Sequence, residues 1–313
     1  MTSSSPPVAP RHLGALLGLA CGDAVGTTVE FAPPGSFEPV TDMLGGGPFR
    51  LAAGEWTDDT SMALCLAASL VQRGAFDATD QMKRYLRWRD SGYMSSNGRC
   101  FDIGGTVSDA LQRFARSGDP VAGSTAADMA GNGSLMRLAP IPMAFAHDPR
   151  LAIDRAAEMS RTTHGAQQAV DACRYYCGLM VGALSGASKE ALLAPMFAPE
   201  PGVWDHAPLE PAIEEIALGS FLQREPPEIR GSGYVVQSLE AALWAFSRGD
   251  DFESCVLLAV NLGEDADTTG AICGQLAGAF YGASSIPPHW RERLVEAAMI
   301  EQLAAGLQAL SSR

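Results

Sequence analysis

Two segments near opposite ends of the 313-residue chain carry a glycine at every fourth position. The first series is Gly14, Gly18, Gly22 and Gly26, and the second is Gly270, Gly274, Gly278 and Gly282. A spacing of four places residues on one face of an α-helix, so each helix would carry a strip almost without side chains. Because each glycine inside a helix costs roughly 0.5–1 kcal/mol relative to alanine, such strips indicate that another backbone packs very closely. We predict that the helix over 11–26 packs against the helix over 267–281, strip against strip.

The remainder of the chain predicts further helices and no sheet. Apolar residues recur at helical spacing, and no stretch alternates apolar and polar residues between hairpin turns. We therefore expect an all-α fold, a single compact multi-helix bundle over 11–313, after a Ser/Pro-rich disordered tail over 1–10. The other expected helices cover about 57–73, 79–90, 106–116, 134–145 (broken by Pro140 and Pro142), 149–161, 165–184, 189–197, 209–222, 234–247, 252–262 and 288–310.

Composition excludes several classes of partner. The formal net charge of −14 and the pI of about 4.7 argue against nucleic acid and anionic membranes, which bind basic surfaces. The seven cysteines are odd in number and scattered, without the C-x-x-C spacing of zinc or redox sites. The apolar stretch over 14–26 is interrupted by Asp23, which argues against a membrane span or signal peptide. We expect a reduced, cytoplasmic, monomeric protein with no integral membrane contact.

Carboxylates and hydroxyls gather at two expected helix starts. Asp265 and Asp267 are followed by two threonines, and far upstream Asp58 and Asp59 lie between Thr57 and Thr60. Oxygen-only ligand sets of this kind suit Mg²⁺, Mn²⁺ or Ca²⁺. The alternative is that these residues are helix caps, with Thr57 capping the helix that follows it. Because each cluster holds more such residues than a cap needs, we favour one metal site between the two facing helix starts.

Other candidate residues lie outside the two clusters. Asp102 precedes Gly104-Gly105 at an expected helix start, where it serves either in acid/base chemistry or as an N-cap. Glu30 is a second candidate acid or base, at the end of the first glycine-rich helix. His164 lies between two helices, where a hydrogen-bonded structural role is the commoner one. The chain has no P-loop, no Rossmann glycine motif after a strand and no G-x-S-x-G elbow, so a metal-centred mechanism is favoured.

Five short motifs together carry a resemblance to a known family. In chain order they are Gly22-Asp23-Ala24-Val25-Gly26 with Glu30, Thr57-Asp58-Asp59-Thr60, Gly131-Asn132-Gly133-Ser134 with Met136-Arg137 and Pro140, Thr163-His164, and Asp265-Ala266-Asp267-Thr268-Thr269-Gly270. This set resembles the ADP-ribosylglycohydrolase family, and is most like its bacterial dinitrogenase-reductase-activating glycohydrolase branch. The resemblance covers about 13–290, while the segments 91–100 and 198–231 match poorly.

The resemblance implies an all-helical hydrolase that holds two Mg²⁺ or Mn²⁺ ions in a cleft. The implied metal ligands are Thr57, Asp58, Asp59, Asp265, Asp267 and Thr268, with Asp267 placed to bridge the ions. The implied catalytic carboxylates are Glu30 and Asp102. The implied ADP-ribose groove contains Gly104, Gly105, Asn132, Gly133, Ser134, His164 and Tyr234, although ordinary core packing is the alternative for Tyr234. The diphosphate would lie against glycine-rich helix starts at 104–105 and 131–133.

The implied reaction removes ADP-ribose from a modified protein, so the expected partners are ADP-ribose and an ADP-ribosylated protein. The setting of Asp102 favours an N-glycosidic bond to arginine. The alternatives are a serine-linked or small-molecule ADP-ribose conjugate, or a relative that binds ADP-ribose without catalysis. One residue departs from the pattern, because Glu264 stands where related bacterial enzymes often have a small residue. It would either strengthen metal binding or point to solvent.

Overall fold

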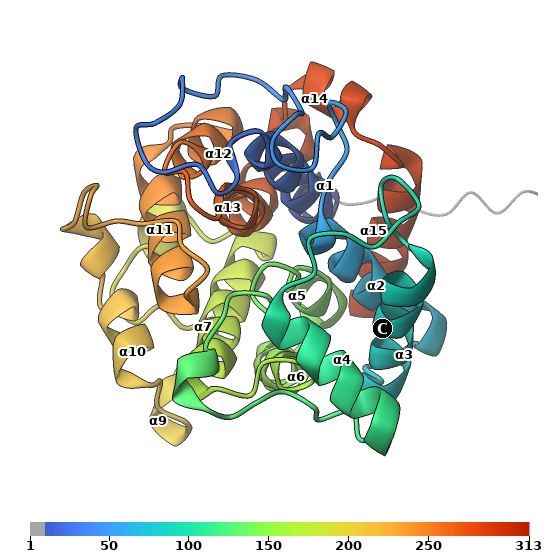
Figure 1. Ribbon diagram of the computed structural model, residues 1–313. Helices are drawn as coiled ribbons and strands as arrows, with labels where there is room; N and C mark the ends of the chain where they lie inside the picture. Colours follow the sequence, from blue (N-terminus) through green and yellow to red (C-terminus); the bar gives the residue numbers. More distant parts are fainter. Residues whose placement is uncertain (1–9, 313) are drawn as a thin grey trace, which may run out of the picture.

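The computed structural model of the protein describes residues 10–312 (Figure 1). The expected tail over 1–10 therefore lies, except for Pro10, outside the described residues. The α-helices are α1 (Pro10–Gly26), α2 (Asp58–Arg73), α3 (Ala78–Ser91), α4 (Gly105–Ser117), α5 (Pro140–Phe145), α6 (Pro149–Arg161), α7 (Gln167–Leu184), α8 (Lys189–Leu192), α9 (Val203–His206), α10 (Pro211–Ala217), α11 (Val235–Arg248), α12 (Phe252–Val260), α13 (Ala266–Tyr281), α14 (Pro288–Arg293) and α15 (Ala297–Ser311). Within the described range the only β pairing is three isolated bridges, so the all-α prediction is confirmed.

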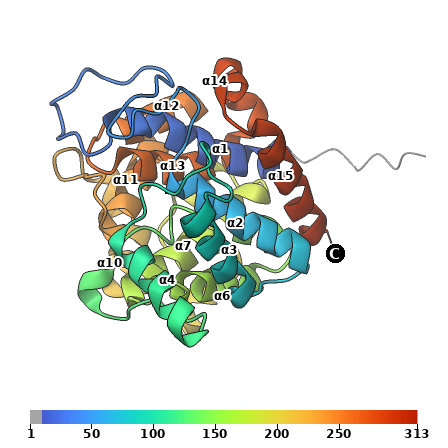
Figure 2. The same cartoon turned by 45° about the vertical axis from the view of Figure 1, so that its right-hand side comes forward.

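Helices α1 and α13 lie side by side in the interior, and their backbones touch along the two glycine strips (Figures 1 and 2). A Cβ atom added to Gly14 would lie 2.1 Å from the Gly278 carbonyl oxygen, and one added to Gly18 would lie 2.2 Å from that of Gly274. At Gly22 the added atom would lie 2.0 Å from the carbonyl oxygen of Gly270. These distances leave no room for any side chain, so the predicted strip-against-strip packing is confirmed.

The other helices surround this central pair. Helices α7, α11 and α12 pack against α13, while α2, α5 and α15 contact α1. Helix α6 lies between α5 and α7, and α3 and α4 extend the α2 side of the bundle. The core side chains are mostly Leu, Ala, Val and Met with a few large aromatics. The glycine strips therefore lie at the centre of the bundle, where both faces of α1 and α13 are buried.

Several expected helices differ from the structure. The helix expected over 189–197 ends at Leu192, the one expected over 209–222 runs only from Pro211 to Ala217, and α9 lies where no helix was expected. The helix expected over 288–310 is divided into α14 and α15, because the Val295 amide donates a hydrogen bond to the carbonyl of Gly54. Glu296 then adopts φ +56° at the turn into α15. The segment expected to open a helix at 134 instead forms turns, and Pro140 begins α5 rather than breaking it. Proline suits the first turn of a helix, where its missing N–H has no intrahelical partner.

The long connection between α1 and α2 is fastened to the C-terminal helices. Asp42 accepts hydrogen bonds from Trp290 Nε1 and Arg293 Nη1, each at 2.7 Å, and from the Met43 amide. Asn261 at the end of α12 pairs through its side chain with both backbone groups of Val40. These contacts hold the residues that follow Glu30 in one position over the N-terminal end of α13.

One described helical segment, Pro10–Val29, is long and apolar enough to cross a membrane, with a mean hydropathy of 1.2. Of that window, 83% is buried inside the protein, as expected for the core helix described above. All seven cysteines are free thiols, and all but Cys100 are buried.

Candidate metal and substrate site

The N-terminal ends of α2 and α13 meet beside the C-terminal half of α1, and Asp23 of α1 joins them. Asp23 Oδ1 accepts hydrogen bonds from the Thr57 amide (2.9 Å) and hydroxyl (3.0 Å). Its Oδ2 accepts from the Thr60 amide (3.0 Å) and hydroxyl (2.6 Å). Thr57 is the N-cap residue of α2, as predicted, but its side chain forms no cap hydrogen bond to that helix. Its hydroxyl is directed to carboxylates instead.

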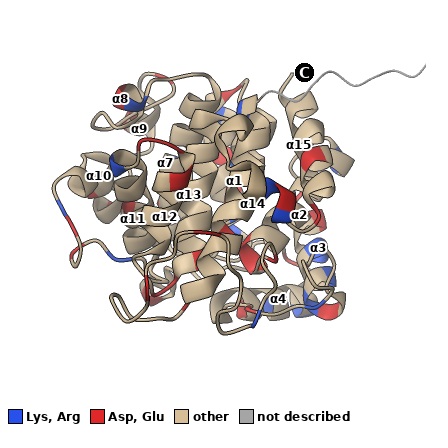
Figure 3. Ribbon diagram, turned by 90° about the horizontal axis from the view of Figure 1, so that it is seen from above, with Lys and Arg blue, Asp and Glu red and all other residues tan. Residues whose placement is uncertain are grey.

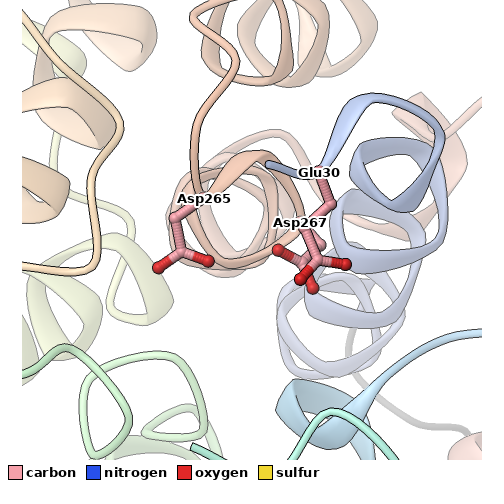
Figure 4. Close-up of side chains that lie close together, drawn as sticks. All are labelled: Glu30, Asp265 and Asp267. Atoms are coloured by element: carbon pink, nitrogen blue, oxygen red, sulfur yellow. The ribbon is translucent and has the colours of Figure 1, made fainter. Parts of the chain in front are cut away.

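Carboxylate oxygens of Glu30, Asp265 and Asp267 all lie within 4.8 Å of one another. Figure 4 shows the three side chains pointing to the same side of the N-terminal end of α13. The Thr57 hydroxyl lies 3.1 Å from Asp267 Oδ2 and 3.3 Å from Asp59 Oδ2. The structure thus brings the two acidic segments together, as the sequence predicts, and adds Glu30 to them.

The remaining expected ligands lie beside this group. Thr268 places its hydroxyl 3.3 Å from Asp59 Oδ2, which connects α13 to α2. Asp59 is fully buried, and its Oδ1 has no hydrogen-bond partner. Asp58 is nearly buried and lines the adjacent cleft. The metal-ligand roles of these residues stay predictions, but their oxygens occupy one small region.

Burial and mutual repulsion oppose ionisation of the cluster. Burial, followed by the charges of Asp102 and Asp265, raises the pKa of Glu30 to about 9. The pKa values of Asp59 and Asp267 are raised well above the ordinary range, again by burial first and by neighbouring carboxylates second. Several buried carboxylates at close range cannot all carry a charge without a compensating cation.

No side chain in the described part of the protein supplies that cation. None of the ion pairs involves the clustered carboxylates of Glu30, Asp58, Asp59, Asp265 or Asp267. Figure 3 shows Lys and Arg (blue) on outer helices such as α3, α4 and α14. The buried charge of the cluster is therefore left without a basic partner.

The cluster fits divalent cations in both chemistry and size. Its donors are carboxylate and hydroxyl oxygens, which Mg²⁺ and Mn²⁺ prefer. Ligand oxygens on opposite sides of a Mg²⁺ ion lie about 4.2 Å apart, and the three carboxylates already lie within 4.8 Å. The Thr57 hydroxyl has one proton but lies within hydrogen-bond distance of three carboxylates, from Asp23, Asp59 and Asp267. At least two of these three carboxylates therefore receive no proton from Thr57, and a cation would satisfy them. The buried Oε2 of Glu30, which has no hydrogen-bond partner, could be satisfied in the same way.

Asp102 joins the cluster from the segment before α4. Its backbone adopts φ +59°, and Gly104 rather than Asp102 is the N-cap of α4, so the capping alternative for Asp102 is wrong. This conformation is strained for a residue with a side chain, and Asp102 lines the same cleft as Glu30 and Asp265. Burial, together with the charges of Asp265 and Asp23, raises its pKa to about 7. A carboxyl with that pKa can both give and take a proton near neutral pH.

A cleft of about 830 Å³ opens directly from the acidic cluster. Of the residues expected to bind substrate, the cleft is lined by Gly104, Gly105, Asn132, Gly133 and His164. Asn132 connects the cleft wall to the acidic cluster, because its side-chain amide donates a 2.6 Å hydrogen bond to Asp265 Oδ2. Gly131 forms an isolated bridge with Tyr234 and residues 133–137 form turns, so the expectation of a helix start at 131–133 is wrong, whereas 104–105 do begin α4.

His164 forms part of the cleft wall as a neutral ring. Burial and the nearby Arg137 lower its pKa to about 3, and its Nδ1 lies 2.8 Å from the Thr163 hydroxyl. A Cβ atom at Gly133 would lie 2.9 Å from the ring, which explains why glycine stands there. Arg137 is fully buried and donates to the Gly133 carbonyl and to Thr163. These contacts support the structural alternative for His164 and also fix the floor of the cleft.

Two expected substrate residues lie elsewhere. Ser134 is fully buried, and its hydroxyl accepts hydrogen bonds from Ser160 (2.9 Å) and Cys173 (3.4 Å). Tyr234 is 39% exposed, is not among the residues that line the cleft, and donates from its hydroxyl to Gln168. Its partial exposure excludes the core-packing alternative.

Some residues at the site were not predicted to belong to it. Ser232 and Gly233 line the cleft, and the Gly233 carbonyl accepts from the Asn132 amide. Phe31 lines it too and is 62% exposed. The sequence shows that a phenylalanine directly follows Glu30. It does not show that the ring is exposed, and without that fact nothing distinguished Phe31 from a core residue.

The sequence and the fold are similar to those of known proteins. The profile of the ADP-ribosylglycohydrolase family matches residues 4–313. The chain is 46% identical over 297 residues to the ADP-ribosylarginine hydrolase Tri1 of Pseudomonas putida, covering 95% of this chain and 77% of that protein. It is 35% identical to the ADP-ribosyl-[dinitrogen reductase] glycohydrolase of Rhodospirillum rubrum, covering 93% and 92% of the two chains. A solved structure described as an ADP-ribosylglycohydrolase-related protein complex superposes with a TM-score of 0.84 at 49% identity, covering 96% of this chain and 98% of that one.

Proposed function

The chain belongs to the ADP-ribosylglycohydrolase family, and on that basis we propose that it hydrolyses the N-glycosidic bond between ADP-ribose and arginine in a modified protein, with two divalent cations. The observation that carries the proposal is the buried cluster of carboxylates, which opens into a cleft of about 830 Å³. Similarity to a protein named as an ADP-ribosylarginine hydrolase supports the arginine linkage.

The proposed ligands of the two cations are Thr57, Asp58, Asp59, Asp265, Asp267 and Thr268, with Glu30 at the edge facing the substrate. When bound, Mg²⁺ or Mn²⁺ ions polarise substrate oxygens and lower the pKa of coordinated water. The first contribution of the protein's own residues is to position the ADP-ribose. Asn132 and the glycines at 104, 105 and 133 line the cleft where the ADP-ribose would lie, and their backbone can approach the diphosphate closely.

Glycosidic cleavage passes through an oxocarbenium-like state, with positive charge on the ribose. Glu30 and Asp265 line the cleft, and their proposed role is to stabilise that charge through their carboxylates. The oxygen of the attacking water bonds to the anomeric carbon, and the bond from that carbon to the guanidine nitrogen breaks. Asp102 accepts a proton from this water as the new bond forms. The proton then passes to the departing nitrogen, which leaves Asp102 as it began. Its pKa of about 7 suits both transfers.

The test is release of ADP-ribose from arginine-linked and serine-linked ADP-ribosyl peptides, each with Mn²⁺, with Mg²⁺ and with chelator. Release from the arginine peptide alone, abolished by chelator, is the expected result. Release from the serine peptide alone would keep the metal site and overturn the arginine linkage. Binding of ADP-ribose without release from either peptide would identify a non-catalytic binding protein.

A further inference from the structure

Glu264 lies at the edge of the cleft, directly before Asp265, in a position that the backbone fixes. Its φ is +56°, in the left-handed region that few non-glycine residues occupy. Two backbone hydrogen bonds hold it against the segment after Glu30, from the Phe31 amide to the Glu264 carbonyl (2.6 Å) and from the Glu264 amide to the Ala32 carbonyl (2.8 Å). Strained residues that persist in this way cluster at ligand sites.

The Glu264 carboxylate is only partly satisfied. Its Oε1 forms an ion pair with Arg230, whose side chain is 50% exposed. Its Oε2 is buried and has no hydrogen-bond partner, although the residue lines the cleft. A buried carboxylate oxygen without a donor is costly, so this atom is suited to a donor that a ligand brings. The carboxylate does not belong to the Glu30, Asp265 and Asp267 group, so it is available for a different purpose.

Phe31 is the second residue with unused binding capacity in the same cleft as this carboxylate. It is 62% exposed, lines the same cleft, and contacts Phe49 edge-on with ring centroids 6.4 Å apart. Phe49 in turn contacts Phe101 at 5.3 Å, so the three rings form a row beside Glu30 and Asp102. The face of an aromatic ring attracts a cation, and arginine is its most frequent partner.

From these contacts we infer that Phe31 and Glu264 form the subsite for the guanidinium group of the acceptor arginine, an inference that rests on the proposed function. Each residue is a direct neighbour of a cluster member, Glu30 or Asp265, so both lie at the end of the cleft where the glycosidic bond would be placed. A guanidinium is planar, carries several N–H donors and stacks on aromatic faces. It therefore matches an open ring together with an unpaired carboxylate oxygen. These residues select the acceptor and do not touch the bond that breaks.

The experiment uses the full chain with Mn²⁺ and ADP-ribosyl-arginine, and compares Glu264→Gln and Phe31→Leu with the wild type. Each substitution is expected to raise KM by about ten-fold and to leave kcat within about two-fold, because the lost contacts are made equally in substrate and transition state. Phe31→Trp, which keeps an aromatic face, is expected to have the same KM as the wild type. Glu38→Gln is the matched control, since Glu38 is exposed on the same connection.

A binding measurement separates this inference from other roles. The dissociation constant of free ADP-ribose, which lacks the guanidinium, is expected to be the same in all five proteins. Weaker ADP-ribose binding in Glu264→Gln would place Glu264 on the nucleotide and overturn the inference. An unchanged KM in both Glu264→Gln and Phe31→Leu would also overturn it while leaving the proposed function intact. A wild-type protein that releases no ADP-ribose from the arginine substrate would contradict the proposed function itself, and the inference with it.

Discussion

Asp23 Oδ1 accepts two hydrogen bonds from Thr57, one from the backbone amide at 2.9 Å and one from the hydroxyl at 3.0 Å. The hydroxyl also lies 3.1 Å from Asp267 Oδ2, so a single threonine side chain connects α1, α2 and α13. Asp23 thus positions the first of the two segments that we propose to bind metal, although it is not itself expected to bind the ions.

Asp23→Asn is expected to lower the free energy of unfolding of the metal-free protein by about 2–4 kcal/mol. Its NH₂ group would face donors from Thr57 or Thr60, which would then be buried without an acceptor. Urea denaturation measures the effect, with Asp154→Asn on the exposed face of α6 as the control. Equal stability of the two variants would show that Asp23 does not hold the helix starts together.

Gly22→Ala is expected to cost about 3 kcal/mol or more, or to prevent folding. The added methyl would lie 2.0 Å from the Gly270 carbonyl oxygen, and α1 and α13 would have to move apart. Gly105→Ala is the matched control, because no atom lies within 4 Å of the added methyl there. Thermal unfolding of both variants is the measurement, and similar midpoints would contradict direct backbone contact.

Asp267→Asn is expected to weaken Mn²⁺ binding by at least about 100-fold, since even residues behind a ligand contribute about 10–100-fold. Titration calorimetry is expected to give two ions per wild-type chain. Without metal, the same variant is expected to be at least as stable as the wild type, because it removes one of several repelling buried carboxylates. A large loss of metal-free stability would indicate a structural role. The exposed Asp109→Asn serves as the control.

Asp102→Asn is expected to lower kcat by about 10²–10⁴-fold while metal and ADP-ribose affinities change little. Asparagine tolerates the left-handed conformation that Asp102 adopts, so the local fold should persist. The pH dependence of kcat is the sharper measurement. Without metal the pKa of Asp102 is raised to about 7, and bound cations would lower it, so the wild-type profile should show a group titrating at or below pH 7 that the variant lacks. The same transition in both proteins would assign it to another group.

Asp42→Asn is expected to destabilise the protein by about 2 kcal/mol at pH 7, and by almost nothing at pH 2. Burial alone would raise the pKa of Asp42, but hydrogen bonds from Arg293, the Met43 amide and Trp290 outweigh it and lower the pKa to about 2. A lowered folded-state pKa stabilises the protein above the ordinary value of 3.8, and that stabilisation is lost as the pH falls towards 2. Urea denaturation of both proteins across this range isolates the Asp42 contribution. A difference that does not change with pH would contradict it.

The sequence predicted the fold and the site best where residue type and spacing allow only one physical explanation. Eight glycines at a spacing of four permit little except close backbone contact, and that contact places the start of α13 beside Asp23 and Glu30. The two acidic segments could be paired because oxygen ligands in excess of capping needs have few other uses. Both predictions depend on residue type and spacing, which are properties of the chain itself.

Features set by distant contacts could not be predicted. Nothing between Leu294 and Glu296 breaks a helix by composition, yet the chain turns there because Val295 bonds to Gly54, whose missing side chain allows the approach. Asp23 looked like an interruption in an apolar helix, and its four donors come from a segment more than thirty residues away. Ser134 belongs to a motif, but whether a motif residue faces the cleft or the core depends on Ser160 and Cys173.

The pairing of α1 with α13 also has a consequence for the order in which the protein is made. The first glycine strip and the Asp58-Asp59 segment leave the ribosome before their partner strip and Asp265, which follow only after about two hundred further residues have been translated. Until then α1 lacks the backbone against which it packs, and its apolar surface is exposed to other chains or to chaperones. Contacts between such distant parts of a sequence form slowly, since a long loop must close first. Until Asp265 and Asp267 have been translated, a nascent chain therefore carries only the first of the two segments that we propose to bind cations.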